Sequence, residues 1–189
     1  MLYDGCEFNH RRRVDNLVRK KLAVGKLAEK AKKIKLVLTD NDGVLTDACV
    51  YYSDKGEQLK RYSVRDGMGV ERLRNILNIE TGIITKERQA LIKKRAKKLK
   101  IKELYHNAEK KELVLEKILR KHKLKKENIA YIGDDENDIE ILRLAGLTAA
   151  PSDGMKSVKQ VVDFVCKNSG GNGAFREFAE LIIELKQKK

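Results

Sequence analysis

The chain has 189 residues, of which 41% are hydrophobic and 37% charged, and its formal net charge is +14. This length is typical of one globular domain with a substantial core. No apolar run approaches the roughly 18 to 20 residues that a transmembrane helix needs, so we expect no membrane partner. The three cysteines are scattered, with no CxxC pair and no disulfide framework, and we therefore expect a reducing, cytoplasmic location.

Positive charge is concentrated at the N-terminus. Residues 1–35 carry eleven Lys or Arg against four Asp or Glu, which is half of the net charge. We assign residues 1–33 to a basic extension, which the loosely helical spacing of its apolar residues predicts to be a helix. We favour an amphipathic helix that packs on the body over one that contacts RNA or an acidic partner. Few aromatic residues are available to stack on bases, so we expect no nucleic-acid partner.

From residue 34 to 189, short apolar runs alternate with segments of helical period. Strands are expected at Lys35–Thr39, Thr81–Thr85, Ile129–Gly133, Leu147–Ala150 and Asp163–Cys166, and helices at Gly69–Leu77, Glu87–Leu99, Lys111–His122, Asp138–Ala145, Met155–Val162 and Ala174–Lys186. Apolar strands separated by helices favour a parallel sheet that is covered on both faces. The predicted fold is therefore a doubly wound, Rossmann-like α/β domain, with ligands beyond the carboxyl ends of its strands.

One stretch, Cys49–Val64, interrupts the alternation. The β-favouring residues Val50, Tyr51 and Tyr52 precede SDKG, a turn-forming cluster, and spaced apolar residues follow it. We predict a β-hairpin that stands off the sheet. An exposed hairpin has strand edges with unpaired backbone groups, and it carries Tyr51, Tyr52, Leu59 and Tyr62. Pairing with another subunit would protect these edges.

Two acidic clusters follow apolar strands: TDND after the first strand, and GDDEND after the strand predicted at Ile129–Gly133. The carboxyl ends of parallel strands share one edge of the sheet, so both clusters should meet there. The carboxylates concerned are Asp40, Asp42, Asp134, Asp135 and Asp138. Carboxylates this close repel one another unless a cation neutralises them, and oxygen ligands suit Mg²⁺.

Two more residues belong to the same predicted edge. Thr85 ends the strand in GIIT and can present its hydroxyl and nearby backbone N–H groups to an anion, while Lys111 begins a helix and supplies a positive charge. A carboxylate nucleophile, a hydroxyl, a lysine and Mg²⁺ together make sense for phosphoryl transfer.

The segments DNDGVLTD, GIIT, Lys111 and GDDENDIEIL resemble the four ordered motifs of the haloacid dehalogenase superfamily of phosphatases. Together with the hairpin, VRDGMGV and GGNGAFRE, they resemble the phosphatases of that superfamily that act on 3-deoxy-D-manno-octulosonate 8-phosphate. The similarity covers residues 34–187. It implies a haloacid dehalogenase-type α/β fold with a protruding hairpin and no large cap domain.

The resemblance also implies catalytic roles. Asp40 would be the nucleophile, and Asp42 the general acid that later serves as the base. Mg²⁺ would lie between the carboxylates of Asp40 and Asp134 and the backbone carbonyl of Asp42. Asp135 would assist through water, and Asp138 would orient the lysine.

Phosphate would be bound by backbone N–H groups of Asn41 and Gly43 and by the side chains of Thr85 and Lys111. Lys110 is adjacent to Lys111, and the resemblance leaves the choice between them open.

Substrate contacts are implied for two further segments. VRDGMGV would place Arg65, Asp66 and Gly67 near the sugar or its carboxylate. In GGNGAFRE, Gly171 and Gly173 would let the C-terminal segment reach an active site, with Arg176 as a contact; without the resemblance, an ordinary turn explains these glycines equally well.

The resemblance further implies a homotetramer in which hairpins from four subunits form the core and a neighbour closes each site. Asp47 receives no chemistry, and we expect it to serve the start of the hairpin.

We therefore expect a Mg²⁺-dependent phosphomonoesterase that acts on a phosphorylated acidic sugar, first of all 3-deoxy-D-manno-octulosonate 8-phosphate. One departure weakens that choice: the family usually shows Gly-Arg after the threonine, whereas this chain has Lys86 and Glu87. A nonulosonate 9-phosphate of sialic-acid type, a broad range of sugar phosphates, and a non-catalytic binding module are the alternatives.

Overall fold

The structure is a computed structural model, and it describes residues 25–87 and 90–188. Its main sheet has six strands in the order β5-β4-β1-β6-β7-β8, and every neighbouring pair is parallel. The strands are β1 (Leu36–Thr39), β4 (Glu80–Ile84), β5 (Glu103–Tyr105), β6 (Ile129–Ile132), β7 (Leu147–Ala150) and β8 (Phe164–Val165). The predicted doubly wound sheet is confirmed.

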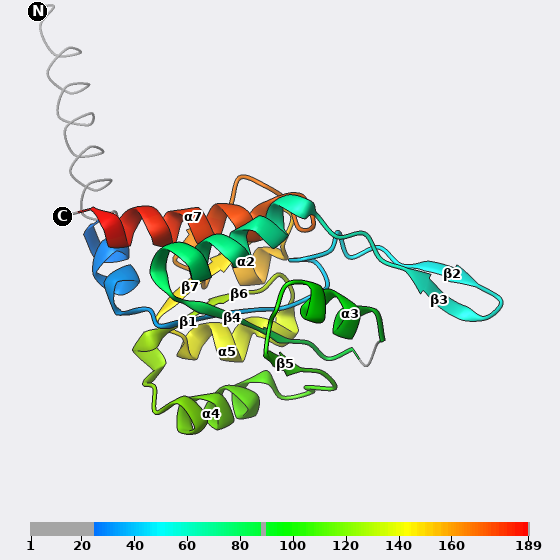
Figure 1. Ribbon diagram of the computed structural model, residues 1–189, viewed down its shortest axis with the longest axis horizontal. Helices are drawn as coiled ribbons and strands as arrows, with labels where there is room; N and C mark the ends of the chain where they lie inside the picture. The colour runs from blue at the N-terminus through cyan, green and yellow to red at the C-terminus, as the bar shows by residue number, and fades with distance from the viewer. Residues whose placement is uncertain (1–24, 88–89, 189) are drawn as a thin grey trace, which may run out of the picture.

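Helices cover both faces of this sheet, as Figure 1 shows. The longer helices are α2 (Val64–Leu77), α3 (Ala90–Lys98), α4 (Lys111–His122) and α7 (Ala174–Gln187), and the shorter ones are η1 (Lys126–Asn128), η2 (Glu136–Asp138), α5 (Ile139–Leu144) and α6 (Lys156–Lys159). One core cluster joins the sheet to α2, α3 and α7, and a second joins it to α4, α5 and α6.

Strand β1 lies in the middle of the sheet, and all four of its residues are buried. Its side chains alternate between the two clusters, because Val37 packs with α7 while Leu36 and Leu38 pack with α4. A strand that is apolar on both faces is therefore held rigidly, and it ends directly at Asp40.

Helix α2 begins at Val64, five residues before the predicted start at Gly69. The hydroxyl of Ser63 accepts a hydrogen bond from the Arg65 N–H and caps the helix. Glycines lower helix propensity, which is why this first turn was not predicted. Gly69 favours close packing, since a Cβ atom there would make a tight contact of 3.1 Å with the Cα atom of Arg176 in α7.

Strand β5 was not predicted either. It has only three residues and lies at the edge of the sheet, where it pairs with β4. Buried Glu103 in this strand accepts hydrogen bonds from Lys121 and Tyr105, so a polar residue occupies a position where we expected only apolar ones.

The predicted hairpin is present as β2 (Tyr51–Ser53) and β3 (Gly56–Leu59), an antiparallel pair apart from the main sheet. Figure 1 shows it projecting from the body of the molecule. Tyr51, Tyr52 and Leu59 are 60%, 70% and 62% exposed. The side chain of Asp47 accepts hydrogen bonds from Cys49 N–H and Arg61, so it does serve the start of the hairpin.

Residues 25–33 are helical and pack on the body, with Ala31 fully buried and Leu27 against the core. Lys186 of α7 donates hydrogen bonds to the carbonyl groups of Ala31, Lys32 and Ile34, which holds the end of this helix. The rest of the predicted N-terminal extension, residues 1–24, lies outside the described residues. Over the described part of the chain, no helix has the length and apolarity required to cross a bilayer.

Candidate active site

The loop after β1 carries the first acidic cluster. Asp40 is 5% exposed, and its Oδ1 atom accepts a hydrogen bond of 2.6 Å from the Asn41 N–H. Gly43 has a φ of +78°, and a Cβ atom there would lie 1.8 Å from Oδ2 of Asp134. Only glycine allows this loop to approach the second acidic cluster so closely.

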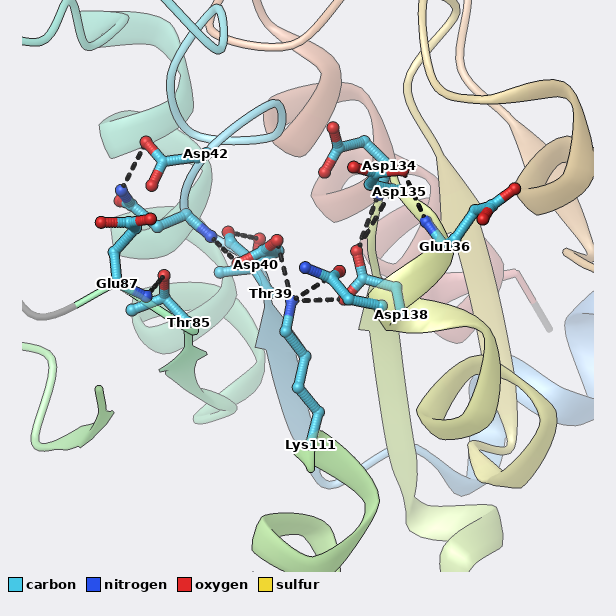
Figure 2. A network of polar contacts seen from close by, with 12 residues as sticks. Thr39, Asp40, Asp42, Thr85, Glu87, Lys111, Asp134, Asp135, Glu136 and Asp138 are labelled. Atoms are coloured by element: carbon cyan, nitrogen blue, oxygen red, sulfur yellow. Dashed lines mark hydrogen bonds and ion pairs between the residues drawn. The ribbon is translucent and has the colours of Figure 1, made fainter. Parts of the chain in front are cut away.

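The second cluster follows β6. Asp134 and Asp135 precede the short helix η2, Asp138 is its last residue, and Figure 2 shows Asp40 and Asp134 at the ends of adjacent strands. Asp138 is fully buried, and its Oδ2 accepts from the N–H groups of Asp134 and Asp135 at 3.1 and 3.4 Å. The two predicted clusters are thus brought together at one edge of the sheet.

Lys111 connects the clusters from below (Figure 2). Its side chain is 1% exposed, and its Nζ atom lies 2.8 Å from Oδ2 of Asp40 and 2.6 Å from Oδ1 of Asp138. Lys110 is exposed, as the residue that precedes the helix. Lys111 is therefore the lysine that lies in the carboxylate cluster, and its contact with phosphate stays a prediction.

Thr85 is buried at the end of β4. Its backbone N–H donates to the Tyr105 carbonyl at 2.9 Å, so that N–H is committed to the sheet rather than to an anion. Its Oγ1 accepts from the Glu87 N–H at 3.2 Å, which leaves the hydroxyl proton to donate to a ligand.

Asp40 and Asp134 hold protons more readily than ordinary carboxylates do while no cation is bound, because their pKa values are raised. Burial, with the charge of Asp138 next, raises the pKa of Asp40 from 3.8 to about 7, although Lys111 opposes the change. Burial and the charge of Asp40 raise the pKa of Asp134 to about 8. One lysine is thus too little positive charge for this cluster.

The donor set fits a hard divalent cation. Carboxylate oxygens of Asp40, Asp134 and Asp138 come within 4.8 Å of one another. Asp138 is a poor ligand, since Lys111 and the Tyr131 hydroxyl already occupy its Oδ1 and backbone N–H groups its Oδ2. In contrast, Oδ1 of Asp134 is buried and has no hydrogen-bond partner among the described residues. Asp40 and Asp134 would therefore hold Mg²⁺.

A cavity of about 360 Å³ opens over this cluster. It is lined by Asp40, Asp42, Ala48, Val50, Tyr52, Glu57, Lys60, Thr85, Lys86, Glu87, Asp134, Asp135 and Asn137. Four of these residues come from the hairpin segment, which the sequence linked only to assembly. Lys60 in particular was missed, although its Nζ atom lies 2.8 Å from Oδ1 of Asp42.

The residues predicted to contact the sugar lie outside the lining of this cavity. Arg65, Asp66, Gly67, Gly173 and Arg176 are not among the described residues that line this cavity. Asp66 is 1% exposed and accepts hydrogen bonds from the N–H groups of Gly173 and Arg176. Its carboxylate therefore joins α2 to the start of α7 in this chain.

The glycine-rich segment before α7 is a turn packed on the catalytic loop. Gly171 N–H donates to the Val44 carbonyl at 2.9 Å, and a Cβ atom on Gly170 would lie 1.9 Å from the Gly43 carbonyl oxygen. Gly173, with a φ of +110°, precedes the first residue of α7. Within one chain, these glycines allow close backbone contact.

A family model described as haloacid dehalogenase-like hydrolase matches residues 71–178. The 3-deoxy-D-manno-octulosonate 8-phosphate phosphatase KdsC of Salmonella typhi is 37% identical over 154 residues, which are 82% of this chain and 81% of that protein. The chain belongs to the haloacid dehalogenase-like hydrolases, and the reaction class of its curated relatives makes it a phosphoric monoester hydrolase.

Solved structures agree with this family. The phosphatase of Moraxella catarrhalis, in complex with magnesium, phosphate and KDO, superimposes with a TM-score of 0.82 at 34% identity, covering 85% of this chain and 91% of that one. The cobalt-bound phosphatase of Haemophilus influenzae has a TM-score of 0.81 at 34% identity, covering 84% and 92%. Within its family, the chain therefore resembles the octulosonate 8-phosphate phosphatases in sequence and in fold.

Proposed function

We propose that the protein hydrolyses 3-deoxy-D-manno-octulosonate 8-phosphate through an aspartyl-phosphate, with Mg²⁺ as its cofactor. The observation that carries the proposal is the pairing of buried Asp40 with half-buried Asp134, with Lys111 2.8 Å from Asp40 and an oxygen on Asp134 that has no hydrogen-bond partner among the described residues. When bound there, Mg²⁺ would neutralise the carboxylates and the non-bridging phosphate oxygens.

The chain's own residues divide the chemistry into two steps. In the first, the Asp40 carboxylate forms a bond to phosphorus while the bond to the sugar oxygen breaks, and Asp42 gives that oxygen a proton. In the second, Asp42 takes a proton from water, which attacks phosphorus and releases phosphate and free Asp40. Lys111 and the Thr85 hydroxyl donate to the phosphoryl oxygens, while Asp138 holds Lys111 in place.

The cavity supports an acidic sugar as the substrate. Exposed Lys86 lines it beside the carboxylate cluster, so positive charge is available for a substrate that carries both phosphate and carboxylate. The relatives named for octulosonate 8-phosphate and the complex that contains KDO support this choice among acidic sugars.

One observation favours a second candidate, a nonulosonate 9-phosphate. Glu87 lines the cavity at the place where the family usually carries arginine. The Glu87 carboxylate attracts hydroxyl or amine donors of a sugar and repels the sugar's own carboxylate. It therefore changes which acidic sugar the site prefers.

A substrate panel tests the proposal. We expect purified protein to release phosphate from octulosonate 8-phosphate with a higher kcat/KM than from a nonulosonate 9-phosphate or a hexose phosphate, and EDTA to abolish the release. A higher kcat/KM for the nonulosonate would establish the second candidate. No turnover of any phosphomonoester at saturating Mg²⁺ would contradict the assignment of the site itself.

A single substitution tests the nucleophile. Asp40→Asn keeps the size of the side chain but removes the attacking carboxylate, so we expect turnover to fall by at least about 10⁴-fold. Rapid acid quenching with ³²P-labelled substrate should trap a phosphoenzyme in the wild type and none in the variant. A variant that still turns over at a tenth of the wild-type rate would contradict the role of Asp40.

We also propose that the protein is a homotetramer joined through the hairpin, and that it works in the cytoplasm. The exposed Tyr51, Tyr52 and Leu59 support the first proposal, because such a patch is costly to leave in water. The free thiols of Cys49 and Cys166 are consistent with a reducing compartment.

A further inference from the structure

We propose that Lys60, at the base of the hairpin, is a positioning residue that holds the carboxylate of Asp42 so that its Oδ2 atom carries the transferred proton. The proposal rests on the role of Asp42 in the proposed function. It adds a residue from outside the four motifs and gives the hairpin a task within its own subunit.

The contact between Lys60 and Asp42 is partly buried, since the side chain of Asp42 is 26% exposed. The side chain of Lys60 is 2% exposed, and its Nζ atom lies 2.8 Å from Oδ1 of Asp42. A lysine side chain is seldom buried without a partner, and Asp42 is the partner that the described residues supply. Charge-assisted hydrogen bonds of this length fix geometry better than neutral ones do.

The two oxygens of Asp42 have different surroundings. Oδ1 accepts three hydrogen bonds, from Lys60 Nζ, from Asn41 Nδ2 at 3.1 Å and from the Thr46 hydroxyl at 3.2 Å. Oδ2 is buried and has no hydrogen-bond partner among the described residues. Three donors saturate one oxygen, so the other is the atom left to give a proton to the leaving group and to take one from water.

The position of Lys60 is itself held by the base of the hairpin. The next residue, Arg61, lies 2.7 Å from Asp47, and the Tyr62 hydroxyl donates to Asn41 Oδ1 at 3.3 Å. A backbone bridge also joins Tyr62 to Thr46. Residues 60–62 therefore each bind the loop that follows the nucleophile, and we call this row of contacts the hairpin seam.

A comparison of leaving groups tests the proposal. Protonation by Asp42 matters for an alkoxide leaving group but little for p-nitrophenolate, which leaves readily without a proton. For Lys60→Met we expect kcat/KM to fall at least about tenfold on the sugar phosphate and less than about threefold on p-nitrophenyl phosphate. Because kcat/KM reports only the steps up to phosphoenzyme formation, the second step does not mask the difference.

Matched variants make the comparison specific. Asp42→Asn should show the same selective loss to a greater degree, and Lys60→Arg, which keeps a charged donor, should recover part of the activity. Lys55→Met, at the exposed turn of the same hairpin, should behave like the wild type. A crystal structure of Lys60→Met should show the Asp42 carboxylate rotated away from its wild-type position.

Three results would count against the proposal. Equal losses on both substrates would assign Lys60 a structural role, and a raised KM for the sugar phosphate with unchanged kcat would make it a substrate contact. An unrotated Asp42 carboxylate in the Lys60→Met crystal would also count against it. The wild-type panel decides the proposed substrate separately, since any alkyl phosphate that the wild type hydrolyses can replace the octulosonate here.

Discussion

The buried charge of Lys111 helps to explain how the protein tolerates several carboxylates close together in its interior. Its neighbours Asp40 and Asp138 raise the pKa of Lys111 despite its burial, so the lysine stays charged. Burial, and after it the charges of the neighbouring carboxylates, raise the pKa values of Asp40 and Asp134 more than Lys111 lowers them. The carboxylates still lack positive charge beside them, and this lack is the physical basis for the cation site.

Magnesium affinity should therefore depend on pH. In the metal-free protein, Asp40 and Asp134 have pKa values of about 7 and about 8, so both bind protons at pH 6 that Mg²⁺ must displace. We expect the association constant, measured by calorimetry, to rise between pH 6 and 8.5 and then to level off. An affinity independent of pH over this range would contradict these raised values.

The same shifts predict the stability of the metal-free protein. Because the folded-state pKa values exceed the ordinary aspartate value of 3.8, the folded state binds more protons than the unfolded state between pH 4 and 8. The free energy of unfolding in EDTA should therefore decrease as pH rises through this window. Saturating Mg²⁺ should reverse the loss at pH 8, which urea titrations at several pH values would show.

At the residue scale, the site residues that could be predicted from the sequence are those at the ends of strands. Asp40, Thr85 and Asp134 each directly follow an apolar strand or end it, so the parallel sheet alone brings them together. Lys60 could not be found this way, since it reaches Asp42 only through the folding back of the hairpin. The burial of Lys111 rather than Lys110 also depends on how the start of α4 faces the sheet.

Among the elements, α2 and α7 are the pair whose contact the sequence did not reveal. Gly67 and Gly69 lower the helix propensity of the first turns of α2, although Gly69 also favours the close packing of α7. Buried Asp66 then binds the start of α7, which has no side-chain cap of its own at Gly173. The motif VRDGMGV is thus explained within one chain by packing and capping.

Replacing Asp66 should destabilise the protein. Asp66→Ala leaves two backbone N–H groups at the start of α7 without their acceptor, which should cost about 1 to 3 kcal/mol in the free energy of unfolding. Asp66→Asn, which keeps one acceptor oxygen, should cost less. Urea unfolding measures both, with Asp54→Ala in the exposed hairpin turn as the control. Unchanged stability with a raised KM would instead favour the predicted contact between Asp66 and the sugar.

On the scale of the whole molecule, the hairpin is the feature whose stability the contacts with the body of the protein do not explain. Its strands pair only with each other in the described structure, and an isolated two-stranded hairpin is at best marginally stable in water. The hairpin seam fixes one end, while the apolar side chains near the tip remain exposed. Assembly through that end is the arrangement that would bury them.

Sedimentation equilibrium should give four times the subunit mass of 21.6 kDa. Tyr51→Glu combined with Leu59→Glu places charges at two exposed apolar positions, and should yield smaller species, because buried unpaired charges oppose association. Asp54→Ala, which changes a charge at the neighbouring turn, should leave the mass unchanged. A wild-type protein that sediments as a stable monomer would contradict assembly through the hairpin.

The close contact of Gly170 and Gly171 with the loop at residues 43–47 has a consequence for biosynthesis. The nucleophile is made early, but the loop that holds it rests on a turn made some 130 residues later, and the same core requires Phe175 and Phe178 of α7. A chain still attached to the ribosome cannot complete this loop until its C-terminal segment has emerged. Chains truncated before Gly170 should therefore contain Asp40 without phosphatase activity.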